Sequence, residues 1–177
     1  MDYNSLAEFP PISWKSQDGS QLTLRPLGTD DVDILLAFVS SLSYGTRYFR
    51  FGSGDLEFNR ASVEKLCALN NCECVHFLTL KVDGEQETVV ASAYIVFKEN
   101  ETKCEVAIAV ADAWQLNGIG KRLMEALLLQ TKARHMTEIF GKILVTNKRM
   151  IGFMRRQGFA INNSPETSAI KIAQIFL

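Results

Sequence analysis

The stretch that most constrains the fold is Cys104–Leu129, where the spacing of the hydrophobic residues changes. Val106, Ile108 and Val110 alternate with alanines, which is typical of a strand buried on both faces. Further on, the apolar residues recur at the spacing of one helix face, and they are Ile119, Leu123, Met124, Leu127 and Leu128. The change of period across residues 115–120 predicts a strand, a turn and a helix.

The predicted turn contains two glycines, Gly118 and Gly120, at the point where the helix begins. Glycine allows positive φ and lets backbone N–H groups come close to a ligand. The unpaired N–H groups at a helix start carry partial positive charge, which suits a phosphate or diphosphate. The segment is therefore a candidate phosphate-binding loop, and a turn softened by glycine without a ligand is the alternative.

Two nucleotide-binding motifs do not fit this loop. A dinucleotide fingerprint needs three glycines and an acidic residue about 20 positions further on, and a P-loop needs Gly-Lys followed by Ser or Thr. Here Lys121 follows Gly120, but Arg122 stands where the hydroxyl residue belongs. The remaining pattern is Gln115-x-x-Gly-x-Gly after a buried strand.

The composition is that of one soluble globular domain. The chain has 177 residues, of which 47% are hydrophobic and 22% charged, and its net charge is −1. Scattered Lys and Arg with a net charge near zero argue against a large nucleic-acid surface. No apolar run approaches the ~18 residues of a membrane span, and the beginning lacks the pattern of a signal peptide. We expect a cytoplasmic protein that binds neither nucleic acid nor membrane.

Three cysteines lie near one histidine in the sequence, at Cys67, Cys72, Cys74 and His76. Thiolate and imidazole are zinc ligands, but zinc sites usually have two or more residues between neighbouring ligands. The last three of these residues are separated by one residue each. We therefore expect reduced cysteines and no metal, with a zinc-stabilised interaction domain as the less favoured alternative.

The remaining patterns predict an alternation of strands and helices in one domain, 18–177. We expect residues 1–17 to form an irregular lead-in, because Pro10 and Pro11 interrupt regular hydrogen bonding. Residues 43–54 are expected to form a loop with one helical turn, and Gly158 to end the last helix. The predicted strands are 21–25, 75–82, 89–97, 104–110, 138–145, 159–161 and 169–176, and the predicted helices are 29–42, 60–69, 119–134 and 147–157.

Three segments in this order resemble the GNAT family of N-acetyltransferases. The Gln115-x-x-Gly-x-Gly loop is similar to the family's pyrophosphate loop, and Asn147 followed eleven residues later by Gly158-Phe159 is similar to its closing helix. The early segments resemble the acetyltransferase domain of bacterial protein-lysine acetyltransferases that carry an acyl-CoA-synthetase-like region, and they are Asp18-Gly19, Leu24-Arg25-Pro26-Leu27 and Arg47-Tyr48-x-Arg50-Phe51. The likeness covers roughly residues 11–161.

The resemblance implies an α/β (α+β) fold with a mixed, mostly antiparallel sheet of about seven strands flanked by about four helices. It also implies acetyl-CoA as cosubstrate, with pantetheine along the central strand, the Val110 N–H near the thioester oxygen and diphosphate at the loop amides. Asn147 would bond the pantetheine amide or, alternatively, cap the last helix. The implied cofactor-binding residues are Ile108, Ala109, Val110, Gln115, Leu116, Asn117, Gly118, Ile119, Gly120, Lys121, Arg122 and Asn147.

Transfer of an acetyl group to an amine requires a proton acceptor, because a lysine amine has a pKa near ~10.4. Glu105 is the candidate, since it is ionisable in a segment otherwise made of Val, Ile and Ala, where burial would raise its pKa. In the resembling lysine acetyltransferases a glutamate at the matching place is the general base. The alternative is a strand-end carboxylate that faces water or pairs with Lys103.

One position departs from the family pattern. Many members place a tyrosine seven residues after the asparagine, where it protonates the leaving thiolate, but Met154 stands there and cannot donate a proton. Either the thiolate leaves unassisted, or another group such as Cys104 or Tyr94 supplies the proton, or the enzyme is slow.

Residues 43–59 correspond to the loop on the acceptor side of the family's site. Arg47, Tyr48 and Arg50 could bind a carboxylate of the acceptor or line an amine channel, whereas packing is the alternative role for Tyr48 and Phe51.

The leading hypothesis is an N-acetyltransferase that uses acetyl-CoA and acts on a primary amine, either a small molecule or a protein lysine. The amine attacks the thioester directly, with Glu105 as general base. A sensor or regulatory module that binds acyl-CoA with weak or no catalysis is the alternative that Met154 suggests. The sequence is compatible with a monomer or a homodimer.

Overall fold

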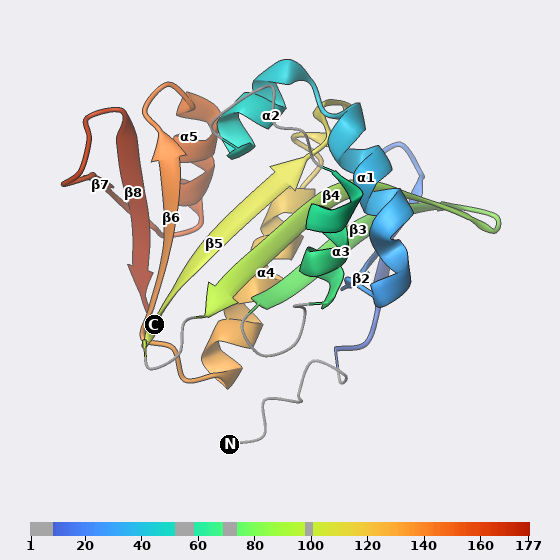
Figure 1. Ribbon diagram of the computed structural model, residues 1–177, viewed down its shortest axis with the longest axis horizontal. Helices are drawn as coiled ribbons and strands as arrows, with labels where there is room; N and C mark the ends of the chain where they lie inside the picture. The colour runs from blue at the N-terminus through green and yellow to red at the C-terminus, as the bar shows by residue number, and fades with distance from the viewer. Residues whose placement is uncertain (1–8, 52–58, 69–73, 98–100) are drawn as a thin grey trace.

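The computed structural model of the chain describes residues 9–51, 59–68, 74–97 and 101–177. In these residues, one 8-stranded sheet has the order β1-β2-β3-β4-β5-β6-β8-β7 (Figure 1). All neighbouring strands are antiparallel except β5 and β6, which are parallel. The strands are β1 Ile12–Lys15, β2 Gln21–Pro26, β3 Cys74–Asp83, β4 Gln86–Phe97, β5 Lys103–Val110, β6 Glu138–Leu144, β7 Ala160–Asn163 and β8 Ile170–Phe176.

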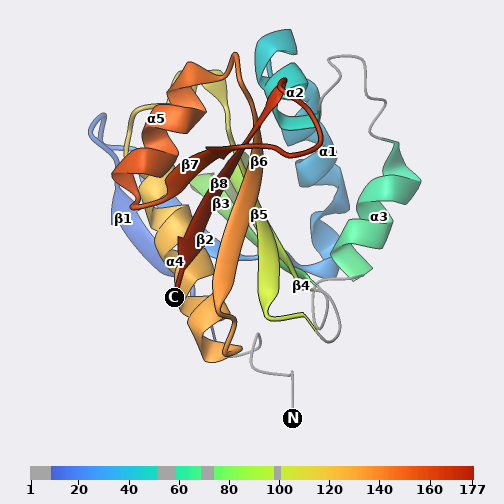
Figure 2. The same cartoon turned by 90° about the vertical axis from the view of Figure 1, so that its left-hand side faces the viewer.

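Helices cover both faces of the sheet, and Figure 2 shows the two layers. On one face lie α1 Val32–Ser41, α2 Tyr44–Phe51 and α3 Arg60–Ala68, and on the other lie α4 Ile119–Ala133 and α5 Lys148–Arg156. The mixed, mostly antiparallel sheet flanked by helices confirms the predicted fold class.

Each face of the sheet has its own hydrophobic core. Leu123, Met124 and Leu127 of α4 are fully buried against one face, and Leu35 and Phe38 of α1 are buried against the other. The central strand contributes to both cores, as its uninterrupted apolar sequence predicts. Its residues facing α4 and α5 are Cys104, Val106 and Ile108, and Ala109 belongs to the opposite core.

The pairing of β5 with β6 ends early. Only Lys103, Cys104 and Glu105 of β5 have partners on β6, although both strands continue beyond that point. The two strands then part, and the opening is visible in Figure 1. Gly141 stands on β6 just past the last pair, where a Cβ would come within 3.2 Å of the Val106 carbonyl oxygen. A side chain at this position would therefore disturb the fork between the strands.

The structure corrects two expectations about irregular segments. The expected lead-in 1–17 is not irregular at Ile12–Lys15, which forms β1 and pairs with β2. The two prolines precede this strand rather than interrupt it. Of the expected loop 43–54, Tyr44–Phe51 is an α-helix instead of a single turn, and residues 52–54 lie outside the described residues. The Ser43 hydroxyl caps this helix by accepting from the Thr46 N–H at 3.2 Å.

The predicted ends of α5 are confirmed. The Asn147 side chain accepts a hydrogen bond from the Met150 N–H at 3.0 Å, as an N-cap residue does. Gly158 follows the helix with φ +89°, the left-handed conformation of a C-terminal glycine. The predicted stop of the second helix near Asn70 lies outside the described residues.

A buried ion pair ties β2 to the turn before α1. Arg25 donates from Nη1 to Asp31 Oδ2 at 2.6 Å and from Nη2 to Oδ1 at 2.9 Å, and Gly28 N–H donates to Oδ2 at 2.6 Å. Burial opposes ionisation of Asp31, but these donors outweigh it and hold its pKa below the usual value. A depressed carboxyl pKa stabilises the fold above the pKa of the unfolded chain.

We predict that Asp31→Asn lowers the free energy of unfolding by ~2 kcal/mol at neutral pH, because it removes a charged partner of Arg25. The difference from the wild type should shrink as the pH falls through the folded-state pKa of Asp31, which lies below ~3.9. Urea unfolding across this range measures the effect. Asp30→Asn, at an exposed neighbouring position, is the control. If the free energy of unfolding differed equally between the variant and the wild type at neutral and acid pH, the stabilisation could not come from the charge of Asp31.

Candidate active site

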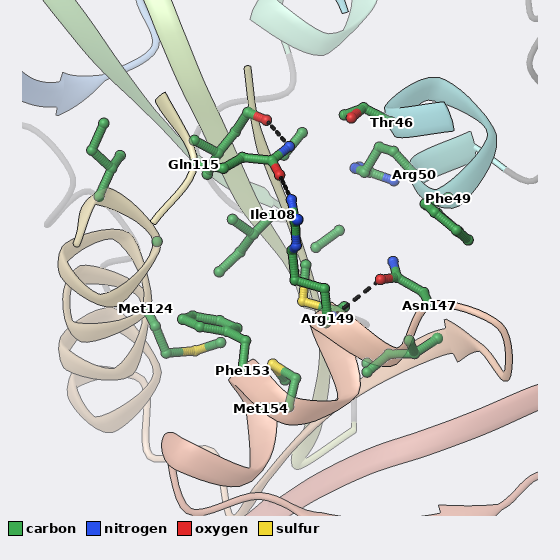
Figure 3. A pocket seen from close by; sticks show the side chains of 18 of the residues that line it. Thr46, Phe49, Arg50, Ile108, Gln115, Met124, Asn147, Arg149, Phe153 and Met154 are labelled. Atoms are coloured by element: carbon green, nitrogen blue, oxygen red, sulfur yellow. Dashed lines mark hydrogen bonds between the residues drawn. The ribbon is translucent and has the colours of Figure 1, made fainter. Parts of the chain in front are cut away.

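A cleft of about 970 Å³ opens where β5 and β6 part. Figure 3 shows side chains from several elements that point into it. Strand β5 contributes residues 106–110, the segment before and into α4 contributes 114–116 and 118–121, and α2 lies across the cleft from α5. The charged residues of the lining are Arg50, Asp112, Lys121, Lys142, Lys148, Arg149 and Arg156.

The loop before α4 carries the features of an anion-binding site. Leu116 and Gly118 have positive φ values of 68° and 78°, a backbone arrangement that turns successive N–H groups toward one side. No residue in the described part of the chain accepts a hydrogen bond from the amides of residues 116–120. These free donors lie at the positive end of a 15-residue helix. The loop therefore fits the diphosphate that the sequence predicts for it.

The two basic residues after Gly120 differ, because Lys121 lines both the cleft and a smaller hollow beside β1, whereas Arg122 lines the hollow but not the cleft. The Arg122 guanidinium carbon lies 4.7 Å from the ring centroid of Trp14. Asn117 also lines the hollow. Of the predicted cofactor-binding residues, Asn117 and Arg122 are the ones that the structure places outside the cleft.

The free edge of β5 forms one side of the cleft. Ile108, Ala109 and Val110 all line it, as the predicted pairing with pantetheine requires. The Val110 carbonyl oxygen accepts a hydrogen bond from Gln115 Nε2 at 3.1 Å. Gln115 Oε1 in turn accepts from Arg149 Nη1 of α5, and Figure 3 shows this side chain reaching across the cleft.

Asn147 caps α5 and also stands at the cleft, so its position is compatible with both roles that the sequence left open. Its Oδ1 is engaged as the cap of α5, and the residue also lines the cleft. Its amide nitrogen makes no hydrogen bond to any described residue and points away from the capped helix (Figure 3). The cap is confirmed, and the bond to pantetheine stays a prediction.

Glu105 lies at the last paired position before β5 leaves β6. It stands opposite Val96 of β4 and Phe140 of β6 and is half-buried. Because strand side chains alternate, Glu105 lies on the sheet face of α1 to α3, opposite the face of Cys104. The side chain is outside the lining of the cleft.

The ion pair that offered an alternative role for Glu105 is not formed. Lys103 Nζ lies 3.0 Å from Glu138 Oε2. The Glu105 carboxylate has no ion pair or hydrogen bond to any residue that the structure describes. Its role as general base stays a prediction.

The three residues considered for the leaving thiolate lie in different places. Met154 is buried and lines the cleft. Cys104 points into the core, with Sγ 3.5 Å from the Glu138 carbonyl oxygen, and burial raises its thiol pKa to about 11. Tyr94 stands opposite Ala107 on the face of Glu105, and neither Tyr94 nor Cys104 belongs to the described lining of the cleft.

Of the three α2 residues expected on the acceptor side, Arg50 lines the cleft, whereas Arg47 and Tyr48 do not. Thr46, Phe49 and Arg50 line it (Figure 3), and the Arg50 guanidinium carbon lies 4.7 Å from the ring centroid of Tyr94. Arg47 instead donates to the Leu42 carbonyl oxygen at 2.5 Å. The sequence did not single out Thr46 or Phe49.

The other three aromatic residues of α2, Tyr44, Tyr48 and Phe51, lie outside the lining. Tyr48 is 39% exposed and stacks on Tyr44, with ring centroids 6.5 Å apart. Phe51 packs against the core beneath α1 and α3, which agrees with its alternative role.

Sequence reasoning also missed Asp112, the one carboxylate among the described residues that line the cleft. Its oxygens accept hydrogen bonds from the Ser43 N–H, the Ser43 hydroxyl and the Thr46 hydroxyl. Burial opposes ionisation of Asp112, but these donors lower its pKa. The partners are 66 and 69 residues away in sequence, so no local pattern signals the contact.

The described residues of the cysteine cluster are buried in the interior of the protein. Cys67, Cys74 and His76 are buried, and His76 Nε2 lies 2.6 Å from the Ser92 hydroxyl. Burial lowers the pKa of His76 to about 3 and raises that of Cys74 to about 11. Among the described residues no three His, Cys, Asp or Glu side chains could hold a metal together; Cys72 lies outside them.

No α-helix in the described ranges is both long enough and apolar enough to cross a membrane.

Comparisons with known proteins agree with this geometry. The model of the acetyltransferase (GNAT) family matches residues 44–159. An acetyltransferase of Pseudomonas aeruginosa is 28% identical over 161 residues, which are 90% of this chain and 86% of that protein. The acetyltransferase Pat of Mycolicibacterium smegmatis is 32% identical over 149 residues, which are 84% of this chain and 44% of Pat. This chain thus matches less than half of the length of Pat.

Solved structures show the same fold. The GNAT domain of S. lividans PAT superposes with a TM-score of 0.82 at 20% identity, covering 96% of this chain and 100% of that one. The PaiA N-acetyltransferase of Thermoplasma acidophilum, in complex with coenzyme A, superposes with a TM-score of 0.72 at 12% identity, covering 88% of this chain and 99% of that one. The family match and the two curated relatives confirm the resemblance seen in the sequence. The chain belongs to the GNAT acetyltransferase family, an N-acetyltransferase family whose members use acetyl-CoA.

Proposed function

We propose that the chain acetylates a primary amine by direct attack on the thioester of acetyl-CoA, with Glu105 as general base. A protein lysine is the acceptor class that we test first, because the early segments resemble protein-lysine acetyltransferases. The observation that carries the proposal is the fork of β5 and β6, with free loop amides at one end and Glu105 at the other.

Several of the chain's own residues would hold the cosubstrate. The amides of residues 116–120 and the Lys121 ammonium suit the diphosphate. The free edge of β5 at Ile108–Val110 suits the pantetheine amides, and the Asn147 amide nitrogen is a further donor. Bound acetyl-CoA supplies an activated acetyl group, and the Val110 N–H would stabilise the negative charge on its carbonyl oxygen.

The charges of the cleft favour Glu105 over the other nearby carboxylate. Asp112 lines the cleft but already accepts hydrogen bonds from Ser43 and Thr46, which lower its pKa and make it a poor proton acceptor. Glu105 has no such partner in the part of the chain that the structure describes. It can accept the proton of an amine directly or through one water.

The leaving thiolate departs without a protein donor in this proposal. A thiolate is a weak base, with a pKa near ~8.5 for a simple thiol, so protonation during bond breaking is dispensable. Met154 therefore does not prevent catalysis. The same residue motivates a second candidate function, a sensor that binds acyl-CoA with weak or no turnover. Calorimetric binding of acetyl-CoA with no thiol release from lysine peptides, polyamines or amino acids would favour the sensor.

We predict that Glu105→Gln lowers kcat by about 10²- to 10⁴-fold, because the amine loses its proton acceptor. Affinity for acetyl-CoA should stay within about twofold of the wild type, since Glu105 does not line the cleft. Thiol release with a lysine peptide measures turnover, and calorimetry measures binding. Glu85→Gln, at an exposed position in the β3–β4 turn, is the control. Unchanged turnover across the pH range would remove Glu105 from the mechanism.

We predict that Gly118→Ala weakens coenzyme A binding by about tenfold. A Cβ at Gly118 would contact nothing within 4 Å, but φ is +78°, and a side chain there costs about 1–2 kcal/mol of backbone strain. The strain should tilt the loop amides away from the diphosphate.

Gly84→Ala is the matched control for this variant, because Gly84 has φ +62° and an equally open surrounding in the β3–β4 turn. Both variants should lose similar thermal stability, but Gly84→Ala should bind coenzyme A as the wild type does. Calorimetry and thermal unfolding measure the two effects. Equal binding by both variants would contradict the role of the loop.

A further inference from the structure

Helix α2 lies beside the cleft with little hydrophobic packing to hold it. None of its residues is buried, whereas α1 and α4 each bury several side chains in a core. Yet Phe49 and Arg50 of α2 line the cleft on the side of Tyr94. Of the residues of α2, Phe51 alone packs against a core, so polar contacts contribute more to the position of this helix than to that of α1 or α4.

The carboxylate of Asp112 provides such contacts. Oδ1 accepts from the Ser43 hydroxyl at 2.9 Å and from the Thr46 hydroxyl at 2.9 Å, and Oδ2 accepts from the Ser43 N–H at 3.2 Å. The same Ser43 hydroxyl accepts from the Thr46 N–H. One ionised side chain therefore holds both the cap and the first turn of α2, and hydrogen bonds to a charged group are the stronger kind.

Asp112 is also part of the path from β5 to the diphosphate loop. It begins the 3₁₀ turn Asp112–Trp114, two positions after the end of β5. Its carbonyl oxygen accepts from the Gln115 N–H at 3.4 Å. The main chain of Asp112 thus belongs to the loop that suits the cosubstrate, while its side chain holds the helix on the acceptor side.

We propose that Asp112 is a positioning residue that fixes α2 against the cosubstrate loop and so keeps the acceptor side of the cleft formed. This inference rests on the proposed function, since it takes α2 to be the acceptor side. Loss of the carboxylate should free α2 and misplace Phe49 and Arg50, which impairs use of the acceptor. It should spare the loop, because the bond to Gln115 uses the main chain, which every substitution of Asp112 retains.

Hydrogen–deuterium exchange of the peptide covering residues 43–51 tests the inference without any turnover. In Asp112→Ala its amides should exchange at least about tenfold faster than in the wild type, since several bonds of about 1 kcal/mol or more are lost together. Asp112→Asn should be intermediate, because the amide keeps one acceptor oxygen but presents a donor to Ser43. Unchanged exchange in Asp112→Ala would overturn the proposal.

Kinetics supply the second readout. Asp112→Ala should raise KM for a lysine peptide by about tenfold, while calorimetry with coenzyme A should give a Kd within about twofold of the wild type. A parallel loss of coenzyme A affinity would overturn the proposal, because it would mean general damage to the loop.

The partner residue gives a matched pair of variants. Thr46→Val removes the hydroxyl that donates to Asp112 and should accelerate exchange in α2, whereas Thr46→Ser keeps the hydroxyl and should exchange as the wild type does. Equal exchange of α2 in the two Thr46 variants would contradict the proposed role of Asp112. If α2 exchanges faster in Asp112→Ala but the wild type acetylates no amine, the positioning of α2 by Asp112 is supported and the proposed function fails.

Discussion

The parting of β5 and β6 beyond Glu105 is the constraint on which the site depends. Buried backbone groups that lose a strand partner must find another, and here the Gln115 side chain satisfies only the Val110 carbonyl oxygen. The rest of the edge suits a ligand that carries its own amides, as pantetheine does. Parallel strands also require a crossover, and the crossover helix α4 begins only a short loop after β5 ends. Its positive end is thereby placed at the mouth of the cleft.

The period of two along β5 places different side chains on the two faces of a single strand. Val106 and Ile108 face the core beneath α4 and α5, while Glu105 lies on the opposite face. On this second face, Ala107 has only a small side chain opposite Tyr94. The Arg50 guanidinium lies over the Tyr94 ring. In the proposed reaction, the Glu105 carboxylate would act from this face, while the phosphate end of the ligand would be bound beyond the far end of the strand.

The sequence predicted the elements whose causes are local. The change of spacing at residues 115–120 identified β5 and α4, and Asn147 and Gly158 identified the ends of α5. The exposed strand β1 was missed because it is short and lacks a buried alternation. Helix α2 was expected to be a single turn, because the carboxylate that binds its cap and first turn belongs to Asp112, which is 69 residues from Ser43 and 66 residues from Thr46. The sequence also could not place Lys121 and Arg122, since neighbouring helix residues point about 100° apart, and only one lines the cleft.

The charges around the cleft bear on the order of events in the proposed reaction. Among the residues that the structure describes, its lining carries one carboxylate, that of Asp112, and six basic side chains, those of Arg50, Lys121, Lys142, Lys148, Arg149 and Arg156. Such a field attracts an anionic cosubstrate and repels an ammonium ion. Binding of the diphosphate reduces that repulsion, so an amine meets a more favourable field once the cosubstrate is in place. The amine must also lose its proton before attack, and the proposed acceptor is Glu105, which lies on the opposite face of the sheet from α5. The basic cleft and the separate carboxylate thus favour a sequence in which the cosubstrate binds first and the amine second.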